Sequence, residues 1–511
     1  MQDINIVFRP EWTCGRYNEK GEVAIFYNLL EGMSYLFEDS SAFVISKLLA
    51  LPRNGSSSVG AIAQQTGIAE ESLIPFFEEL MKLGLLINHQ PDSDEINGYR
   101  QQLADFKKNR SQTVAKTTQE KLPMDVSSAE MDYTDKAGGI ASVMMELTYN
   151  CSEKCIHCYN IGATRNDAEI SHRGDLQELN LDDYKRIIDE LYDEGLVKVC
   201  LSGGDPFSKP IAWDIIDYLY HKGVAFDVFT NGQRITQDVE RLASYYPRLV
   251  GVSIYSGDEQ THDRITRIKG SWRKSMAVVK QLADLAVPMA IKCCIMKPNV
   301  TNYYTVSDIA KQLGAVVQYE INITDSIEGD KCASRYLRLD EKMLEVVLRD
   351  DNIPMYVGEE APNYGGQSRL MDNNACGAGY NSFCITPNGE LIPCCSFHLN
   401  FGNLKEHSVH KIVHDNATLT QWQQLTLNDY EECGRHDYCA YCNLCAGNNY
   451  TEHGDVLKAG ENNCFMAKVR YNLAKRMQSG YDPLHGKPLR ENIAEIDTSE
   501  SIFNALKREY E

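Results

Sequence analysis

The sequence predicts an α/β protein built on a partial (β/α)6 barrel, with an N-terminal winged helix-turn-helix unit and a C-terminal cysteine-rich domain. Three observations support this fold. Strand-like and helical segments alternate six times over residues 140–330, which favours a parallel sheet. A hairpin pattern and two helical patterns occupy residues 1–90. Cysteines, 17 in all, gather in clusters, most of them within residues 372–466.

Length and charge limit the possible functions. A chain of 511 residues should hold two to four domains. A net charge of −21 disfavours a nucleic-acid partner, because phosphate is bound by basic patches. We expect a cytoplasmic protein without a membrane partner, since the sequence shows neither a long apolar span nor a signal-peptide layout. In a reducing compartment, cysteines are better explained by metal ligation or catalysis than by disulfides.

The N-terminal residues 1–90 predict a small α+β unit. Ala24–Asn28 and Met33–Phe37 form a hairpin pattern, a helix is expected at Ser41–Leu51, and two more helical patterns fill 58–87. This order is typical of a winged helix-turn-helix. DNA binding is nevertheless disfavoured, because the unit holds six Lys and Arg against eleven Asp and Glu.

Residues 91–139 are polar and poorly periodic, which predicts a linker with a short helix at Gly98–Lys108. The barrel follows over residues 140–330, with an amphipathic helix at Leu181–Leu191 as an example of its helices. Its strands are expected at Ser142–Leu147, Val197–Leu201, Ala225–Phe229, Val250–Ile254, Met289–Met296 and Val316–Ile321. In such barrels the active site lies on the loops after the carboxyl ends of the strands.

The C-terminal third is less regular. Residues 331–371 are expected to be a connector, and residues 372–466 to be a cysteine-rich domain ordered largely by bound metal. Residues 467–511 form a polar tail with a helix expected at Ser501–Tyr510.

A cysteine triplet follows the first barrel strand. The segment TYNCSEKCIHCYN places Cys151, Cys155 and Cys158 in CxxxCxxC spacing. Three thiolates on one loop can hold three irons of a cubane cluster and leave the fourth iron open. A zinc knuckle is the alternative, but zinc sites usually take four ligands in CxxC pairs.

This spacing, after the first strand of a β/α barrel, resembles the defining motif of the radical S-adenosylmethionine (radical SAM) family. The resemblance implies that the open iron chelates S-adenosylmethionine and that an electron from the cluster releases a 5′-deoxyadenosyl radical. The segment LSGGDPF resembles the family's GGEP-type motif, with aspartate in place of glutamate, and implies that the methionine amino group is bound at Gly203, Gly204, Asp205 and Pro206.

Two further residues at strand ends are expected to bind S-adenosylmethionine by the same resemblance. Ser253 is a candidate ribose contact after the fourth strand, and Asn231 is a second candidate in FTNG after the third strand. Each has a simpler alternative as a strand-end cap, and the glycines of LSGGDPF have one as an ordinary turn.

The C-terminal cysteines carry a second pattern. Cys376, Gly389 and Cys394 fit Cx₁₂Gx₄C. Together with the cysteines that follow, this resembles the SPASM domain of radical enzymes that act on peptides, and it implies two auxiliary [4Fe–4S] clusters, three clusters in all. A pair of zinc sites is the alternative.

The family's interleaved pattern implies two ligand sets. The first set is Cys376, Cys384, Cys394 and Cys445; the second is Cys433, Cys439, Cys442 and Cys464. The sequence departs from the family's usual spacing after Cys433, so either Cys439 or His436 completes the second set, and thiolate is the commoner ligand. The first set has an alternative as well: the cluster either takes Cys384 as its fourth ligand or keeps an open iron.

The N-terminal unit, placed ahead of these domains, resembles the PqqD-like recognition element of peptide-maturation enzymes. The resemblance implies that the leader of a ribosomal precursor peptide adds a strand to the small sheet; a docking or dimerisation domain is the alternative. We expect a radical SAM enzyme that cross-links this peptide oxidatively, through a thioether or a C–C or C–O bond, with a flavodoxin or ferredoxin as electron donor.

Two other functions stay open. An anaerobic sulfatase-type maturase would oxidise Cys or Ser of a protein substrate, but would not be expected to carry a leader-binding unit. An iron–sulfur redox regulator would bind DNA, which the acidic residues Glu70, Glu71, Glu78 and Glu79 of the second helix oppose. No catalytic acid or base stands out among the barrel residues.

Overall fold

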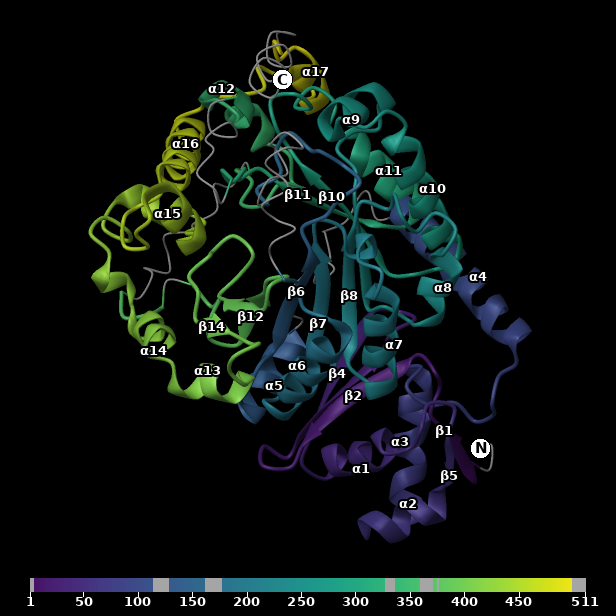
Figure 1. The fold of residues 1–511 in the computed structure, drawn as a ribbon. Helices are drawn as coiled ribbons and strands as arrows, with labels where there is room; N and C mark the ends of the chain where they lie inside the picture. Colours follow the sequence, from purple (N-terminus) through teal and green to yellow (C-terminus); the bar gives the residue numbers. More distant parts are fainter. Residues whose placement is uncertain are drawn as a thin grey trace.

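The computed structural model describes residues 4–113, 128–160, 177–326, 336–358, 371–374 and 376–498. Figure 1 shows a central twisted sheet with helices on its outer side, the N-terminal unit below it, and the cysteine-rich region beside β6. The helix expected at Ser501–Tyr510 lies outside the described residues.

Six parallel strands form the barrel in sequence order. Their bounds are β6 (Ser142–Thr148), β7 (Lys198–Gly203), β8 (Ala225–Thr230), β9 (Leu249–Ser253), β10 (Met289–Cys294) and β11 (Val316–Glu320), and each pairs with the next. All six expected strands therefore form, with ends shifted by at most two residues. Strand alternation is also visible: Val143, Met145 and Leu147 face the helices and are fully buried.

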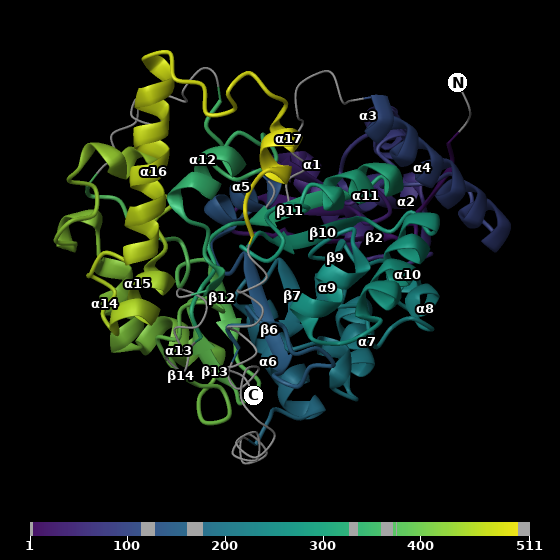
Figure 2. The ribbon, with the colours of Figure 1, turned by 90° about the horizontal axis from the view of Figure 1, so that it is seen from above.

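Helices pack against the outer face of this sheet (Figure 2). They are α6 (Leu181–Asp193), α7 (Ala212–Lys222), α8 (Val239–Ser244), α9 (Glu259–Thr266), α10 (Ser271–Asp284) and α11 (Thr305–Leu313). In α6 the apolar stripe Tyr184, Ile188 and Leu191 is buried, as its spacing predicts. Asn180 caps this helix by accepting a hydrogen bond from the backbone N–H of Asp183.

The cysteine-rich region continues the barrel sheet, which the sequence did not predict. Strand β12 (Ser382–Ile385) pairs in parallel with β6, and β13 (Glu390–Ile392) and β14 (Gly402–Asn403) follow antiparallel, giving a nine-stranded sheet. The other helices of the C-terminal half are α12 (Glu341–Val347), α13 (Val409–Asp415), α14 (Ala417–Gln424), α15 (Ala446–His453), α16 (Glu461–Gln478) and α17 (Leu489–Ala494). Helix α16 runs across the boundary expected at 466/467, and its buried Leu473 shows that packing continues into the expected tail.

The N-terminal unit has a three-stranded antiparallel sheet of β2 (Thr13–Asn18), β3 (Val23–Asn28) and β4 (Met33–Glu38). Strands β3 and β4 are the expected hairpin. Helices α1 (Asp39–Leu49), α2 (Val59–Thr66) and α3 (Glu70–Lys82) follow, and the short strands β1 (Ile6–Phe8) and β5 (Ser56–Ser58) pair with each other. One sheet face packs on α1 and α3 through Phe26, and the other faces the barrel through Tyr27.

The expected linker over residues 91–139 is more ordered than predicted. It contains α4 (Ser93–Thr113), much longer than the expected Gly98–Lys108, and α5 (Ser128–Ala137). Helix α5 is fastened between the sheet and the barrel, because Glu130 accepts a hydrogen bond of 2.8 Å from the Tyr27 hydroxyl and pairs with Lys198 at 3.1 Å. Polar residues are thus buried where the sequence suggested a solvated linker.

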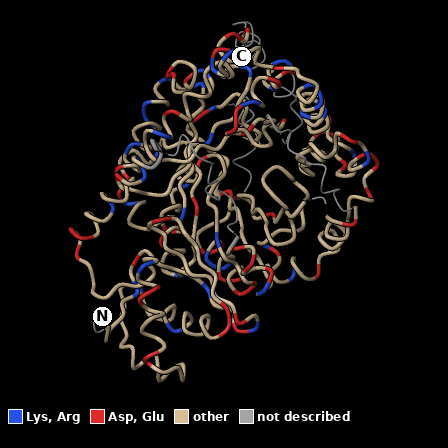
Figure 3. The backbone as a smooth tube through the Cα atoms, turned by 180° about the vertical axis from the view of Figure 1, so that it is seen from behind, with Lys and Arg blue, Asp and Glu red and all other residues tan. Residues whose placement is uncertain are grey.

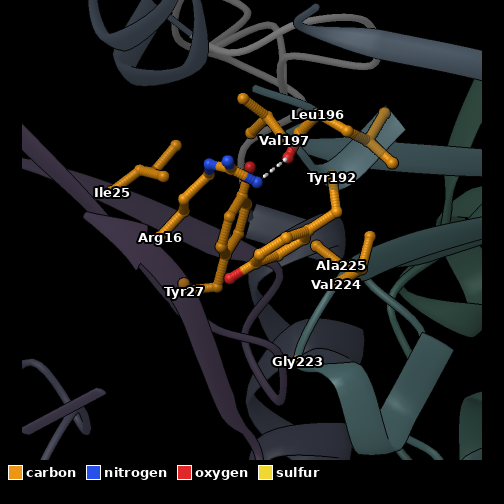
Figure 4. Close-up of a pocket in the computed structure, with 10 residues that line it drawn as sticks. Arg16, Ile25, Tyr27, Tyr192, Leu196, Val197, Gly223, Val224 and Ala225 are labelled. Carbon is orange, nitrogen blue, oxygen red and sulfur yellow. Dashed lines mark hydrogen bonds between the residues drawn. The ribbon is translucent and has the colours of Figure 1, made fainter. Parts of the chain in front are cut away.

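A pocket lies at the junction of the N-terminal sheet and the barrel (Figure 4). The Arg16 guanidinium stacks over the Tyr192 ring at 4.1 Å and donates a hydrogen bond of 3.3 Å to the carbonyl of Leu196. Because Leu196 precedes β7, this junction is at the amino ends of the barrel strands, away from the loops expected to carry the active site.

Charged residues of both signs occur on every side of the molecule (Figure 3). Acidic residues outnumber basic ones, 72 against 51. Among the described residues, no helix combines the length and the apolar character needed to cross a membrane.

Candidate functional site

The loop with the cysteine triplet leaves the carboxyl end of β6 and is held in place by backbone hydrogen bonds. Lys154 and Ile156 donate to the carbonyls of Thr266 and Ile265 at 3.0 Å each, so the loop lies against the end of α9. Cys158 donates to the carbonyl of Cys155 at 3.1 Å, which closes a turn between the last two cysteines.

The three thiols of this loop lie near one another. Burial raises the pKa of Cys155 well above its usual value, and the carboxylate of Glu153 and the thiols of Cys158 and Cys151 raise it further. A bound cluster would offset this cost, because metal charge stabilises thiolates. The same loop buries polar atoms that have no hydrogen-bond partner, on Glu153, His157 and Asn160. The residues present therefore fit an iron–sulfur group bound at this loop.

Gly203 and Gly204 are required by a close approach of two loops. A Cβ on Gly203 would lie 2.4 Å from the carbonyl oxygen of Thr148, and one on Gly204 would lie 2.5 Å from that of Asn150. Gly203 also has φ of +121°, which L residues rarely adopt. The two glycines thus let the LSGGDPF turn rest directly on the backbone that leads into the cysteine loop.

Asp205 is fully buried and its carboxylate is occupied by donors of the chain itself. One oxygen accepts from the backbone N–H of Phe207 at 3.0 Å. The other accepts from the Thr230 hydroxyl at 2.9 Å and from the backbone N–H of Asn231 at 3.2 Å. Pro206, beside it, begins a short 3₁₀ turn and is buried as well. The geometry makes Asp205 a group that joins the second and third barrel loops.

Asn231 reaches the cysteine loop directly. Its side-chain amide donates to the Sγ of Cys151 at 3.2 Å, and its side-chain oxygen accepts from the backbone N–H of Gln233 at 2.9 Å. Ser253 ends β9 on the face of the strand opposite to the buried Val252. Both candidates for S-adenosylmethionine contacts thus lie at the carboxyl ends of strands, as expected.

The inner face of the barrel carries functional groups that the sequence analysis missed. Glu146 lies on β6, is 1% exposed, and accepts a hydrogen bond of 3.2 Å from the Tyr149 hydroxyl. Burial raises the pKa of Glu146 to about 8. Lys292 stacks over the Phe229 ring at 3.3 Å. Strand alternation was the available signal, because Glu146 occupies an inward position between outward Met145 and Leu147.

The adjacent cysteines of β10 take opposite faces. Cys293 is 2% exposed in the main core with the outer helices, whereas Cys294 packs with Cys155 in a small cluster at the cysteine loop. This fits the expectation that one of the two faces the barrel interior.

The first auxiliary set of cysteines converges from separate segments. Burial raises the pKa of Cys394 well above its usual value, and neighbouring thiols, among them Cys445 and Cys376, raise it further. Cys384 lies on β12, where pairing with Met144 of β6 directs its side chain to the inner face. Its own pKa is raised by burial first and then by Glu146 and other thiols. The structure thus brings together Cys376, Cys384, Cys394 and Cys445, and Cys395 lies among them.

The second set surrounds the 3₁₀ turn at 437–441. Burial raises the pKa of Cys464, Lys468 opposes this rise, and the Cys439 thiol adds to it. The Cys442 thiol lies 3.9 Å from the carbonyl of Asn463, next to Cys464 in the chain. His436 is exposed, and its ring stacks on Tyr438 at 4.9 Å. The structure therefore places the Cys439 thiol near Cys464.

Comparison with known proteins gives matches over the barrel and the cysteine-rich region. The radical SAM superfamily matches residues 145–303, and SPASM, an iron–sulfur cluster-binding domain, matches residues 376–446. The antilisterial bacteriocin subtilosin biosynthesis protein AlbA of Bacillus subtilis (strain 168) is 27% identical over 316 residues, which cover 59% of this chain and 65% of AlbA.

The chain is also similar to a heme synthase and to a solved structure with bound AdoMet. The AdoMet-dependent heme synthase of Methanosarcina barkeri (strain Fusaro / DSM 804) is 26% identical over 341 residues, covering 62% of this chain and 94% of that protein. The solved structure of native anSMEcpe with bound AdoMet aligns with a TM-score of 0.51 and 15% identity over 66% of this chain and 98% of that one. The last similarity supports the fold.

Proposed function

We propose that this chain, with its radical SAM and SPASM domains, is a radical SAM enzyme that uses S-adenosylmethionine and [4Fe–4S] clusters to modify a ribosomally synthesised precursor peptide. When bound, S-adenosylmethionine and the cluster at the cysteine triplet would supply a 5′-deoxyadenosyl radical for hydrogen abstraction from the peptide. The product is an intramolecular cross-link, a thioether or a C–C or C–O bond. Similarity to a bacteriocin biosynthesis protein supports a peptide substrate.

The observation that carries this proposal is the position of β4 at one edge of the N-terminal sheet. Its order is β2-β3-β4, and no strand of described residues follows β4. The sheet is held on the barrel side by α5 and Tyr27, which fixes the position of β4. An extended leader peptide would add a fourth strand there, as in other cases of β-augmentation.

Aromatic side chains beside this edge offer the contacts that a leader needs for specificity. Phe37 of β4 meets Phe76 of α3 edge to face at 6.1 Å, and Tyr35 lies on the same strand face. All three are only partly buried. Aromatic anchors of this kind commonly dominate peptide recognition. We infer that residues 1–90 are a PqqD-like leader-recognition element.

The chain's own groups also serve the chemistry inside the barrel. Cross-linking removes one hydrogen atom, one proton and one electron from the peptide in total. We propose that Glu146, on the inner face, accepts the proton when it is ionised, above its raised pKa. The auxiliary cysteines begin beside it at Cys384. Electrons would leave through that side of the sheet toward a flavodoxin or ferredoxin, which also supplies the reducing electron for the radical step.

A binding titration tests the leader site. The probe is the precursor peptide encoded next to the gene, labelled and followed by fluorescence anisotropy. Tyr35→Ala and Phe76→Ala are expected to weaken binding about tenfold each, which corresponds to about 1.4 kcal/mol. Phe43→Ala is the control, because Phe43 is an exposed aromatic residue of the same unit on α1. Equal affinity for all four proteins would overturn the proposed docking edge.

Cluster ligation is the second part of the proposal. We propose Cys151, Cys155 and Cys158 for the first cluster, Cys376, Cys384, Cys394 and Cys445 for one auxiliary cluster, and Cys433, Cys439, Cys442 and Cys464 for the other. Full loading gives about twelve iron atoms per chain. Cys394→Ser and Cys439→Ser are each expected to remove about four iron atoms by anaerobic iron analysis, whereas His436→Ala and Cys14→Ser keep them. Loss of iron in His436→Ala with retention in Cys439→Ser would reverse the assignment.

An activity assay with the precursor peptide distinguishes peptide maturation from the two alternative substrate classes. A haem precursor, suggested by the name of the Methanosarcina relative, or a sulfatase-type protein substrate would not need the N-terminal unit. We expect 5′-deoxyadenosine release under reducing anaerobic conditions to rise when the precursor peptide is added, together with a mass loss of about two hydrogens from the peptide. Unmodified peptide after many turnovers would exclude peptide maturation.

A further inference from the structure

A cluster of metal-ligating side chains lies outside the iron–sulfur region. Glu194 follows α6, and His410 and His414 lie on α13. The Nδ1 of His410 is 2.6 Å from one carboxylate oxygen of Glu194, and the Nε2 of His414 is 2.8 Å from the other. One ligand atom from each residue lies within 4.8 Å of the others. Among the described residues, no other His, Cys, Asp and Glu side chains form so compact a group.

The local structure explains why these three residues meet. His410 and His414 are four residues apart on one helix, so their rings share a face and their centroids lie 4.5 Å apart. The helix is fixed against α6, because the backbone N–H of Val409 donates to Glu190 at 2.7 Å and Ile412 is buried. Glu194 is only 17% exposed. The carboxylate is therefore held still, and the two imidazoles are aimed at it.

We propose that Glu194, His410 and His414 bind a divalent transition-metal ion, with zinc as the expected occupant. Two imidazoles and one carboxylate are a common set of three protein ligands for zinc, with water completing the tetrahedron. Imidazole nitrogen also suits copper and nickel, whereas magnesium and calcium prefer oxygen ligands. In the bound form, the metal takes the place of the protons that now join the rings to the carboxylate.

The location of the site indicates its role. Glu194 precedes β7, so it lies at the amino ends of the barrel strands, whereas the cysteine triplet follows the carboxyl end of β6. Helix α13 belongs to residues 376–446, which match the SPASM domain, and α6 belongs to the radical SAM domain. A metal here would fasten the two domains to each other at the end of the barrel opposite the chemistry. It would contribute to stability and would leave S-adenosylmethionine cleavage unchanged.

The test uses the anaerobically prepared enzyme with its iron–sulfur clusters loaded, so that the cluster cysteines are occupied. The protein is dialysed against zinc chloride, and bound zinc is measured by mass spectrometry of the metals. We expect one equivalent of zinc, with N and O neighbours at about 2.0–2.1 Å and no sulfur at about 2.3 Å in X-ray absorption. His410→Ala, His414→Ala and Glu194→Gln should each lose this equivalent.

His407→Ala is the matched control, because His407 is an exposed histidine close to the same helix and lies outside the cluster. The two histidine variants should fold, since the side chains of His410 and His414 are 71% and 51% exposed. Retained iron content and 5′-deoxyadenosine release would confirm folding. Sulfur-ligated zinc, zinc that survives all three substitutions, or no bound zinc would overturn the proposal and leave the cluster as a set of hydrogen bonds.

Discussion

At the scale of single residues, Asp205 illustrates how the barrel positions its loops. Its carboxylate accepts three hydrogen bonds, from Phe207, Thr230 and Asn231, and Asn231 in turn donates to the Cys151 thiol. Burial raises the pKa of Asp205 to about 6, while hydrogen bonds from Thr230 and from backbone N–H groups oppose the rise. Asp205 therefore joins the second and third barrel loops and, through Asn231, the cysteine loop.

Asp205→Asn tests this role. An amide offers one oxygen where the carboxylate offers two, so at least one donor loses its acceptor, at a cost of roughly 1–3 kcal/mol. We expect a lower melting temperature and weaker S-adenosylmethionine binding by calorimetry, with an unchanged iron content. The exposed Asp182, in the first turn of α6, gives the control Asp182→Asn. Wild-type affinity in Asp205→Asn would show that the bridge to Asn231 does not matter.

Some site residues could be predicted from the sequence because their chemistry depends on local spacing. The triplet Cys151, Cys155 and Cys158 and the turn at Gly203 and Gly204 are of this kind. Other clusters form only because segments far apart in the sequence come together in the fold. Glu194 and His410 are joined by a hydrogen bond although 216 residues separate them, and no local pattern could reveal that pairing.

At the scale of elements, α5 shows why the linker was misjudged. The helix is polar and carries little periodic signal, yet Glu130 is buried against the Tyr27 hydroxyl and the Lys198 ammonium. A sequence pattern that assigns charged residues to the solvent-exposed surface cannot detect a buried ion pair. The barrel strands, by contrast, were predicted within two residues, because runs of apolar residues between helices mark buried parallel strands.

Glu130→Ala measures how much the buried ion pair of α5 contributes to the free energy of unfolding. Removing the carboxylate leaves the Lys198 ammonium buried without its ion-pair partner, and we expect a loss of roughly 3–5 kcal/mol in stability. The readouts are the denaturant midpoint and faster hydrogen exchange in α5 and β3. Lys136→Ala on the same helix is the control, because the pair of Lys136 with Glu38 is 45% and 49% exposed and should be worth at most about 1 kcal/mol. Similar losses of stability in Glu130→Ala and Lys136→Ala would show that the buried ion pair stabilises the fold no more than the exposed one.

At the scale of the whole molecule, the proposed leader site and the reactive loop lie at opposite ends of the barrel. The N-terminal unit contacts Leu196 and Ala225 at the beginnings of β7 and β8 (Figure 4). Figure 1 shows this unit below the barrel sheet. The cysteine triplet follows the end of β6. Strands of about six residues span roughly 20 Å. A peptide held at β4 must therefore extend past the sheet before its core segment can reach the cysteine triplet.

This separation predicts a minimum spacer in the precursor peptide. An extended chain advances at most about 3.3–3.6 Å per residue, so at least about six residues must lie between the leader strand and the modified segment. Shortening that spacer to fewer than about six residues should abolish the mass change of the peptide while its anisotropy-measured affinity stays the same. Inserting six Gly and Ser residues should be tolerated, since a flexible loop lengthens at little entropic cost. If the shortened peptide is still modified at the original residues, the leader must bind somewhere nearer the barrel mouth than β4.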